Sequence, residues 1–419
     1  MRIHNLYLEN YRGIRNIELD FRGKSTVFYG INGSGKTSIL NCISLLLSYV
    51  VNRAVSNQFK QSIAITRNDV RFGSSVTQLG CQFDISDEIM MGYAFQYRKE
   101  TSSRLIRKKE LERLSAAFYA AYLEDDDSNI PVFSYYGVNR AVLDIPLRIR
   151  TKHEFGRLAT YQNCLNSKTD FRTFFEWFRN QEDFENQIKI EKKDFTYTDR
   201  SLEATRRAIT SMLPELSNIR ITRKPLRMCA TKYGKTLSME QLSDGEKCAL
   251  AMFGDLARRL SIANPSLSNP LDGEGIVLID EIELHMHPSW QRNIIPILKK
   301  TFPNIQFIVT THSPLVLGEL DDSFNVFQLN QTENDLLVTM MNPAKYDANL
   351  VLEDWMGTKS VSSEVSELEK EIMQKVYSHD FESAKEGIAR LSKLTNGASP
   401  VITKAEILIK RLSSQVGAK

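Results

Sequence analysis

The stretch that decides the fold is Gly30-Ile31-Asn32-Gly33-Ser34-Gly35-Lys36-Thr37, which satisfies the pattern GxxxxGK[ST]. This phosphate loop lies between a short apolar run, Thr26–Tyr29, and a helical pattern, Ser38–Val50. A glycine loop between a strand and a helix directs backbone N–H groups at phosphate groups, beside the positive end of the helix. We therefore expect an α/β fold with a site for a nucleoside triphosphate. The residues expected to bind it are Asn32, Gly33, Ser34, Gly35, Lys36, Thr37 and Ser38.

Two side chains of this loop and two carboxylates elsewhere are expected to carry the chemistry. Lys36 is expected to reach the β- and γ-phosphates, and the Thr37 hydroxyl to hold Mg²⁺. The apolar run Ile276–Ile279 ends in Asp280 and Glu281. Carboxylates at the C-terminal end of a buried strand emerge beside the phosphate loop of a neighbouring strand. We therefore expect Asp280 to be a second Mg²⁺ ligand and Glu281 to polarise the attacking water. Taken alone, such a strand end is as often an ordinary solvated turn.

The signature segment, Gln241-Leu242-Ser243-Asp244-Gly245-Glu246-Lys247, predicts the start of another helix. Ser243, followed three residues later by Glu246, forms a capping box. A helix that begins here presents backbone amides, and its positive end favours an anion. A plain helix cap and an anion-binding helix end are both compatible with this segment.

Three histidines lie close to these segments in the sequence. His312 belongs to the switch segment, Thr310-Thr311-His312-Ser313-Pro314, which follows the apolar run Ile305–Val309. A lone histidine is more often a packed or surface residue than a functional one. His285 and His287 are separated by one residue, which would place them on opposite sides of a strand, and no set of carboxylate and histidine partners surrounds them. We expect the segment that holds them to be a loop that packs at the seam between subunits rather than a metal site.

In this order, the four segments resemble the cassette-type (ABC-type) ATPases of the SMC, RecF and OLD-nuclease branch. The opening LYLENYRGI, residues 6–14, and the run IVLIDEIELHMHPSWQR, residues 276–292, match that branch as well. The resemblance implies an ABC-type P-loop ATPase head with two lobes around a mixed sheet, and ATP and Mg²⁺ as its ligands. Within the branch, three further phrases resemble the ATPases of the Septu and retron antiphage systems, of which PtuA is one. They are PVFSYYGVNRAVLDIP (131–146), FFEWFRNQEDFEN (174–186) and YDANLVLEDWMG (346–357).

The resemblance also implies that the nucleotide site is shared between two subunits. In such ATPases the signature of one subunit lies over the γ-phosphate held by the other. In this chain Asp244 stands where the LSGGE signature has its first glycine. The residues expected to contact nucleotide in this way are Ser243, Asp244, Gly245 and Glu246.

The same resemblance implies roles for two residues and leaves one unassigned. It makes His312 the switch histidine that touches the γ-phosphate, and Arg12 a contact of the nucleotide. ABC-type ATPases also offer a glutamine to Mg²⁺ after the first lobe. The sequence does not place that contact, and Asp69 and Gln78 are both candidates.

The pattern of the chain suggests four parts. Residues 1–90 form a lobe with the phosphate loop, 91–235 a mostly helical insertion, 236–345 a lobe with the signature, the paired carboxylates and the switch, and 346–419 a helical C-terminal tail. The insertion has an aromatic stripe at helical spacing: Phe171, Phe174, Phe175 and Phe178. The tail has two apolar stripes: Val365, Leu368, Ile372 and Val376, and Ile402, Ala405, Ile409 and Leu412. Because such stripes need a surface to cover, we expect the tail to dock a partner or to pack on the insertion.

The composition excludes several other classes of protein. With 419 residues the chain is longer than a single small module. Its formal net charge of +3, from 54 Lys and Arg against 51 Asp and Glu, provides no strong overall attraction to nucleic acid. The 5 cysteines are scattered without a CxxC pair, which indicates neither a disulfide framework nor a zinc site. No apolar run reaches the roughly eighteen residues of a membrane helix, so we expect a cytoplasmic protein.

We expect an ATP-binding and ATP-hydrolysing subunit of an antiphage complex. It would form a homodimer, or a higher oligomer of dimers, around ATP and regulate a separate HNH nuclease of the PtuB kind. The alternative is a RecF- or SMC-like DNA repair ATPase, because the basic stretches Arg98–Arg113 and Arg220–Arg227 suit phosphate contacts, although basic runs are usually solvated faces. Direct binding of DNA, or of retron RNA and DNA, stays open. An OLD-like nuclease is disfavoured, because the residues after His312 hold no metal-binding cluster beyond Asp321 and Asp322.

Overall fold

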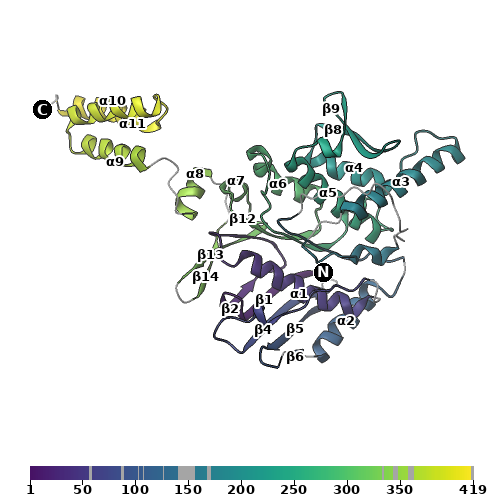
Figure 1. Cartoon of the computed structure of the whole chain (residues 1–419). Coiled ribbons are helices and arrows are strands. Elements are labelled where there is room, and N and C mark those ends of the chain that lie inside the picture. The colour runs from purple at the N-terminus through teal and green to yellow at the C-terminus, as the bar shows by residue number, and fades with distance from the viewer. Residues whose placement is uncertain are drawn as a thin grey trace. The chain divides into compact units, whose positions relative to one another are not determined.

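The structure is a computed structural model (Figure 1). It describes residues 1–55, 59–85, 89–101, 103–106, 108–125, 127–139, 156–167, 171–332, 335–342, 348–356 and 363–416. Parts of three stretches discussed above lie outside the described residues: 140–146, 346–347 and 357, and 102 and 107. The chain forms two compact units, Met1–Tyr346 and Asp347–Lys419. Among the helices that the structure describes, none has the length and apolar character needed to cross a bilayer.

A six-stranded sheet forms the centre of the first unit. Its strands in spatial order are β14 (Leu336–Met341), β13 (Phe324–Gln331), β3 (Ser25–Tyr29), β12 (Ile305–Thr311), β11 (Gly275–Ile279) and β7 (Val132–Tyr136). All neighbours are parallel except β14, which is antiparallel to β13. Every residue of β7, β11 and β12 is buried, as expected of parallel strands covered on both faces. The phosphate loop, the paired carboxylates and the switch segment follow β3, β11 and β12, so they meet at one edge of this sheet.

An antiparallel sheet is formed by the N-terminal part of the chain. Its strands in spatial order are β2 (Ile14–Asp20), β1 (Arg2–Tyr11), β4 (Val76–Ile85), β5 (Ile89–Arg98) and β6 (Ser103–Ile106). The predicted hairpin of β1 and β2 is confirmed. Helix α1 (Lys36–Ala54) contacts β4 of this sheet and β11 and β12 of the central sheet. Helix α2 (Lys108–Tyr122) packs on α1 and β5.

Further helices lie on the other side of the central sheet, where α5 contacts β7. They are α3 (Phe171–Lys192), α4 (Arg200–Met212), α5 (Asp244–Ala263) and α6 (Pro288–Thr301). In the view of Figure 1, α1 lies below the central sheet, and α4, α5 and α6 lie above it. Helix α5 packs against α3, α4 and β7. The helix predicted from the aromatic stripe is confirmed as α3, and the four side chains of the stripe are buried: Phe171, Phe174, Phe175 and Phe178.

The segment 91–235 is mixed rather than mostly helical. It holds α2, α3 and α4, but β5 and β6 extend the N-terminal sheet and β7 joins the central sheet. The alternation of Tyr93, Phe95 and Tyr97, all buried on β5, is the strand signal in this segment. The lobe expected to close near residue 90 therefore continues to the end of β6.

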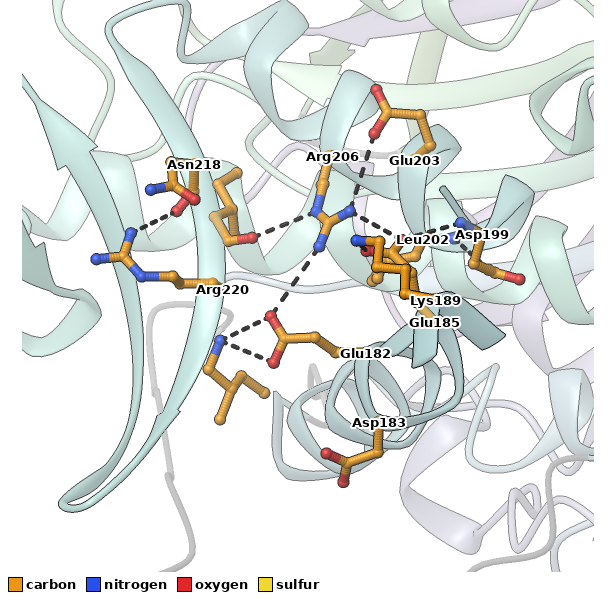
Figure 2. Close-up of polar contacts among 12 residues, drawn as sticks. Glu182, Asp183, Glu185, Lys189, Asp199, Leu202, Glu203, Arg206, Asn218 and Arg220 are labelled. Carbon is orange, nitrogen blue, oxygen red and sulfur yellow. Dashed lines mark hydrogen bonds and ion pairs between the residues drawn. The ribbon is translucent and has the colours of Figure 1, made fainter. Parts of the chain in front are cut away.

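A three-stranded sheet leads into the signature segment. It consists of β10 (Lys235–Ser238), β9 (Leu226–Lys232) and β8 (Leu216–Arg223). Glu182 of α3 accepts a hydrogen bond from the backbone N–H of Ile221 at 3.1 Å and pairs with Arg223 at 3.1 Å. Figure 2 shows Arg206 of α4 beside the carboxylates of Glu182 and Glu203, and its guanidinium lies 3.2 Å from Glu185. The two buried carboxylates of α3, Glu182 and Glu185, thus attach the three-stranded sheet and α4 to this helix.

The second unit is helical, and its apolar stripes face one another. It contains α8 (Ala348–Leu350), the π-helical turn Val351–Trp355, α9 (Ser363–Tyr377), α10 (Phe381–Thr395) and α11 (Pro400–Val416). Its core consists of Leu368, Ile372, Val376, Ala384, Ile388, Leu391, Ala405 and Ile409. The apolar stripes predicted on α9 and α11 are thus buried within this unit, because they pack against α10. The amphipathic pattern alone therefore gives no reason to expect a docked partner.

Candidate nucleotide site

The phosphate loop folds as a glycine turn that opens α1. Gly30 has φ 154, and a Cβ at this position would lie 2.3 Å from the carbonyl oxygen of Leu329. Gly35 has φ 90 and immediately precedes the helix. Both positions therefore require glycine. The predicted phosphate-binding residues, 32–38, line a cavity of about 190 Å³ together with Glu281 and His312. We call it the phosphate cavity.

Lys36 is folded over its own loop. Its ammonium group donates to the carbonyl oxygens of Gly30 and Ile31, both at 2.9 Å, and lies 3.4 Å from the Ser34 hydroxyl. Burial lowers the pKa of Lys36 to about 8, although the nearby carboxylates, Asp280 first among them, act in the opposite direction. A buried cation that is held mainly by neutral carbonyl oxygens suits an incoming anion.

The hydroxyl and the carboxylate expected to bind Mg²⁺ lie together. The Thr37 hydroxyl donates to Oδ2 of Asp280 at 2.9 Å, and the Thr310 hydroxyl donates to Oδ1 at 2.7 Å. The backbone N–H of Asp280 donates to the carbonyl oxygen of Tyr136 at 2.8 Å. Hard oxygen atoms from one or two side chains are what Mg²⁺ takes from a protein when phosphates supply further ligands. The donor set fits this ion, which when bound would neutralise charge on the phosphates.

Glu281 and His312 complete the wall of the phosphate cavity. Glu281 has φ 48, an unusual value for a residue with a side chain, and its backbone N–H donates to the Thr310 hydroxyl at 2.8 Å. Strained backbone of this kind often persists at functional sites. Burial of the imidazole, and then the charge of Lys36, lower the pKa of His312. A neutral imidazole is therefore favoured near neutral pH.

Two residues of this site were not predicted from the sequence. Thr310 bridges the side chain of Asp280 and the backbone of Glu281. Glu283 accepts hydrogen bonds from the Thr311 hydroxyl at 2.8 Å and from the backbone N–H of His312 at 2.5 Å. Their position next to predicted site residues was visible in the sequence, but the contacts join the segment after β11 to the end of the neighbouring strand β12.

The signature segment begins α5 as predicted. Ser243 is the N-cap, its backbone N–H donates to Glu246 at 2.8 Å, and its hydroxyl accepts from the backbone N–H of Glu246 at 3.4 Å. Glu246 also pairs with Lys232 of β9. A Cβ on Gly245 would lie 2.4 Å from the carbonyl oxygen of His285, so glycine is required for the close approach of that loop.

The signature lines a cavity of its own. This signature cavity has a volume of about 720 Å³, and its wall includes Ser243, Asp244, Gly245, Glu246, Lys232, Tyr233, His285, His287 and Trp290. Among the described residues, it shares no lining residue with the phosphate cavity. The predicted signature residues are therefore together, but they are not brought to the phosphate loop of the same chain.

Arg12 is not among the residues that line the phosphate cavity. Its Nε donates to Oδ1 of Asp69 at 2.9 Å, and it lines a third cavity, of about 950 Å³, with Tyr11, Asn41 and other residues. Asp69 also accepts hydrogen bonds from Thr66. Neither Asp69 nor Gln78, which lies on β4, lines the phosphate cavity, so the glutamine contact to Mg²⁺ stays unassigned.

The mostly parallel sheet has a glycine phosphate loop after one strand and paired carboxylates after another. Together with the separate signature at the start of α5, this arrangement defines a P-loop ATPase of the ABC type. The family model described as "AAA domain, putative AbiEii toxin, Type IV TA system" matches residues 25–318. The chain belongs to this family of AAA-domain ATPases.

Relatives of known name agree with this assignment. The "Retron Ec83 probable ATPase" of Escherichia coli is 32% identical over 395 residues, which cover 78% of this chain and 71% of the relative. The "Septu protein PtuA" of Bacillus mycoides (strain KBAB4) is 26% identical over 380 residues, 87% of this chain but 46% of that longer protein. Among solved structures, the Smc head domain of Pyrococcus yayanosii covers 84% of this chain and 99% of its own, with a TM-score of 0.49 and 14% identity.

Proposed function

We propose that this ATPase is the ATP-hydrolysing subunit of an antiphage defence complex of the Septu or retron type. The names of its relatives support this system. The single observation that carries the mechanism is that the phosphate cavity and the signature cavity are lined by different residues of the chain. A second copy of the chain then supplies the signature that one copy cannot bring to its own phosphate loop.

In the proposed site, each residue has a defined task. The loop amides and Lys36 hold the β- and γ-phosphates, and Thr37 and Asp280 hold Mg²⁺. Glu281 polarises the attacking water, a contribution of about 10²–10⁴ in rate for a positioned base. His312 contacts the γ-phosphate, and Ser243 and Gly245 of the second copy donate to it from a helix N-terminus. The seam between two copies excludes water, so these fixed donors act with little screening.

The dimer links the chemistry to defence. Because ATP would contact both copies, it stabilises the closed dimer, and its hydrolysis removes that stabilisation. A separate HNH nuclease then responds to the open or the closed state. The nuclease partner is part of the proposal and rests on the resemblance of this chain to the Septu and retron ATPases.

The proposal is tested by the mass of the protein in solution. Mass photometry of the Glu281→Gln variant with Mg²⁺ and ATP is expected to show a dimer or a multiple of it, and the same variant with ADP a larger monomer fraction. If the variant stays monomeric with Mg²⁺ and ATP, the hypothesis of a nucleotide site shared between two copies is wrong. Co-purification with an HNH protein encoded next to this chain tests the partner. Tight binding to DNA ends or gaps by the chain alone would favour a RecF-like repair function instead.

A further inference from the structure

A third carboxylate, Glu283, lies close to the phosphate cavity, and the proposed reaction gives it no task. It follows Asp280 and Glu281 in the same loop but does not line the cavity. Both of its carboxylate oxygens face the switch segment instead. Oε2 accepts from the Thr311 hydroxyl at 2.8 Å, and Oε1 accepts from the backbone N–H of His312 at 2.5 Å. Hydrogen bonds to an ionised carboxylate are about twice as strong as neutral ones.

The backbone on both sides of His312 is held by such contacts. Thr311 is fully buried, and its hydroxyl also accepts from the backbone N–H of Ser313 at 3.0 Å. The Ser313 hydroxyl in turn donates to Gln291 of α6 at 2.7 Å. His312 therefore extends from a backbone fixed on either side, and its imidazole reaches the phosphate cavity.

Glu283 and Thr310 make reciprocal contacts between the segment after β11 and the end of β12. Thr310, at the end of β12, holds the side chain of Asp280 and the backbone of Glu281. Glu283, beyond the end of β11, holds Thr311 and His312. The end of β12 thus fixes functional residues of the segment after β11, and that segment fixes the switch segment. Because both oxygens of Glu283 accept from the chain itself, a role as proton acceptor or metal ligand is disfavoured.

We infer that Glu283 is a positioning residue of the hydrolysis site, whose carboxylate fixes the backbone of the switch segment and thereby holds the His312 imidazole at the phosphate cavity. The inference rests on the proposed contact between His312 and the γ-phosphate. Glu283 does not touch the phosphate loop, so its loss is expected to slow turnover without weakening ATP binding. A misplacement of about 1 Å in an active site can reduce a rate by about 10²-fold.

Two substitutions at this position separate positioning from charge. Glu283→Ala is expected to lower kcat by about 10- to 100-fold, with KM for ATP changed by less than about threefold. Glu283→Gln keeps an oxygen that accepts from the His312 N–H, and its NH₂ group can donate to the Thr311 hydroxyl, so kcat is expected to stay within about fivefold of the parent. Glu319→Ala is the matched control. It removes a carboxylate that follows the short helix α7 (Pro314–Leu317) and pairs with Arg292, and its kcat is expected to be unchanged.

A double-variant cycle tests the route through His312. His312→Ala is expected to be slow, and Glu283→Ala in the His312→Ala background is expected to be no slower, within about threefold, because coupled residues are not additive. Binding of a fluorescent ATP analogue and the thermal midpoint report whether each variant is folded. Should Glu283→Ala fail to fold, Thr311→Val removes one of the two hydrogen bonds to Glu283, together with the one from the Ser313 N–H, with little change of shape, and an intermediate loss of kcat is expected.

Four results overturn the inference. A Glu283→Ala variant, or a folded Thr311→Val variant, with full kcat shows that the contact has no effect on turnover. Losses that multiply in the double variant show that Glu283 acts independently of His312. A Glu283→Gln variant as slow as Glu283→Ala shows that the charge itself is needed. An unchanged His312→Ala variant removes the proposed role of His312 and the inference with it, whereas a slow His312→Ala beside an active Glu283→Ala removes the inference alone.

Discussion

The helices α1 and α5 begin in different ways, although both helix starts are assigned to nucleotide. Within the described residues, no side chain caps α1, whose N-cap is Gly35 in the left-handed region. Helix α5 starts with a complete capping box of Ser243 and Glu246. The first amides of an uncapped helix lack partners within the helix, so α1 is open to an anion from solution. The start of α5 satisfies part of its own donors and is stable without a ligand.

The charged groups at the two helix starts also differ in whether they already have a partner of opposite charge. Lys36 is buried, with a lowered pKa, and donates to loop carbonyl oxygens, so a phosphate would improve its surroundings. At α5, Lys232 is already paired with Glu246. Under the proposed function, this difference sets an order of events. ATP binds first to the phosphate loop of one copy, and the preformed signature of a second copy then closes over it.

The largest effect is expected from removal of the cation at α1. Lys36→Ala is expected to abolish measurable ATP binding, because a charge-assisted contact to the phosphates is lost in a buried site. Titration with a fluorescent ATP analogue provides the measurement. Lys24→Ala, which changes an exposed lysine that donates to the carbonyl oxygen of Asp322, is the control and is expected to bind normally. An affinity of Lys36→Ala close to that of the control would mean that the two helix starts do not differ as described.

The next effect separates binding from hydrolysis at the same cavity. Glu281→Gln is expected to keep ATP bound and to lower kcat by about 10²–10⁴-fold, because the amide cannot accept a proton from the attacking water. Phosphate release under single-turnover conditions measures the rate, and mass photometry measures the dimer. Unchanged turnover would remove Glu281 from its role.

A substitution at the α5 start tests whether the signature serves another copy. Ser243→Arg is expected to leave ATP binding by the single chain intact and to lower hydrolysis by about 10²-fold or more, the cost of losing fixed donors at a developing charge. Mixing this variant with Lys36→Ala provides the control, because one of the two composite sites in a mixed dimer is then intact and part of the activity is expected to return. If Ser243→Arg hydrolyses ATP at the parent rate, the shared site is wrong.

Local patterns predicted the components of the site better than their arrangement. The phosphate loop and the capping box are contiguous in sequence, so residue spacing was enough to find them, and the apolar runs before Asp280 and His312 gave the strand ends. The contacts of Thr310 and Glu283 could not be predicted in this way. They depend on β11 and β12 being neighbours in the sheet, which is a property of the tertiary fold.

The two clearest departures from expectation also come from tertiary pairing. The strand pattern of Tyr93, Phe95 and Tyr97 was missed, because the segment was interpreted from its charged clusters and its aromatic helix. These three side chains are buried on β5, which pairs with β4 in the N-terminal sheet. The stripes of the C-terminal helices were identified correctly, but their partner was not, because periodicity shows that a face is covered and not what covers it.

The smallest expected effect is a dependence of ATP affinity on pH that arises at α1 alone. With a pKa of about 8 in the ATP-free protein, Lys36 is mostly charged at pH 7.5 and mostly neutral at pH 9. Phosphate groups favour the charged form, so ATP binding raises this pKa and takes up a proton, and affinity falls as the pH rises through 8. From pH 7.5 to 9 the loss is roughly eightfold by proton linkage. Calorimetry in buffers of different ionisation enthalpy measures both the affinity and the proton uptake. Lys36→Arg stays charged throughout this range and is expected to show neither the loss of affinity nor the proton uptake. If the affinity of the parent is equally independent of pH, the Lys36 amine is already charged before ATP binds.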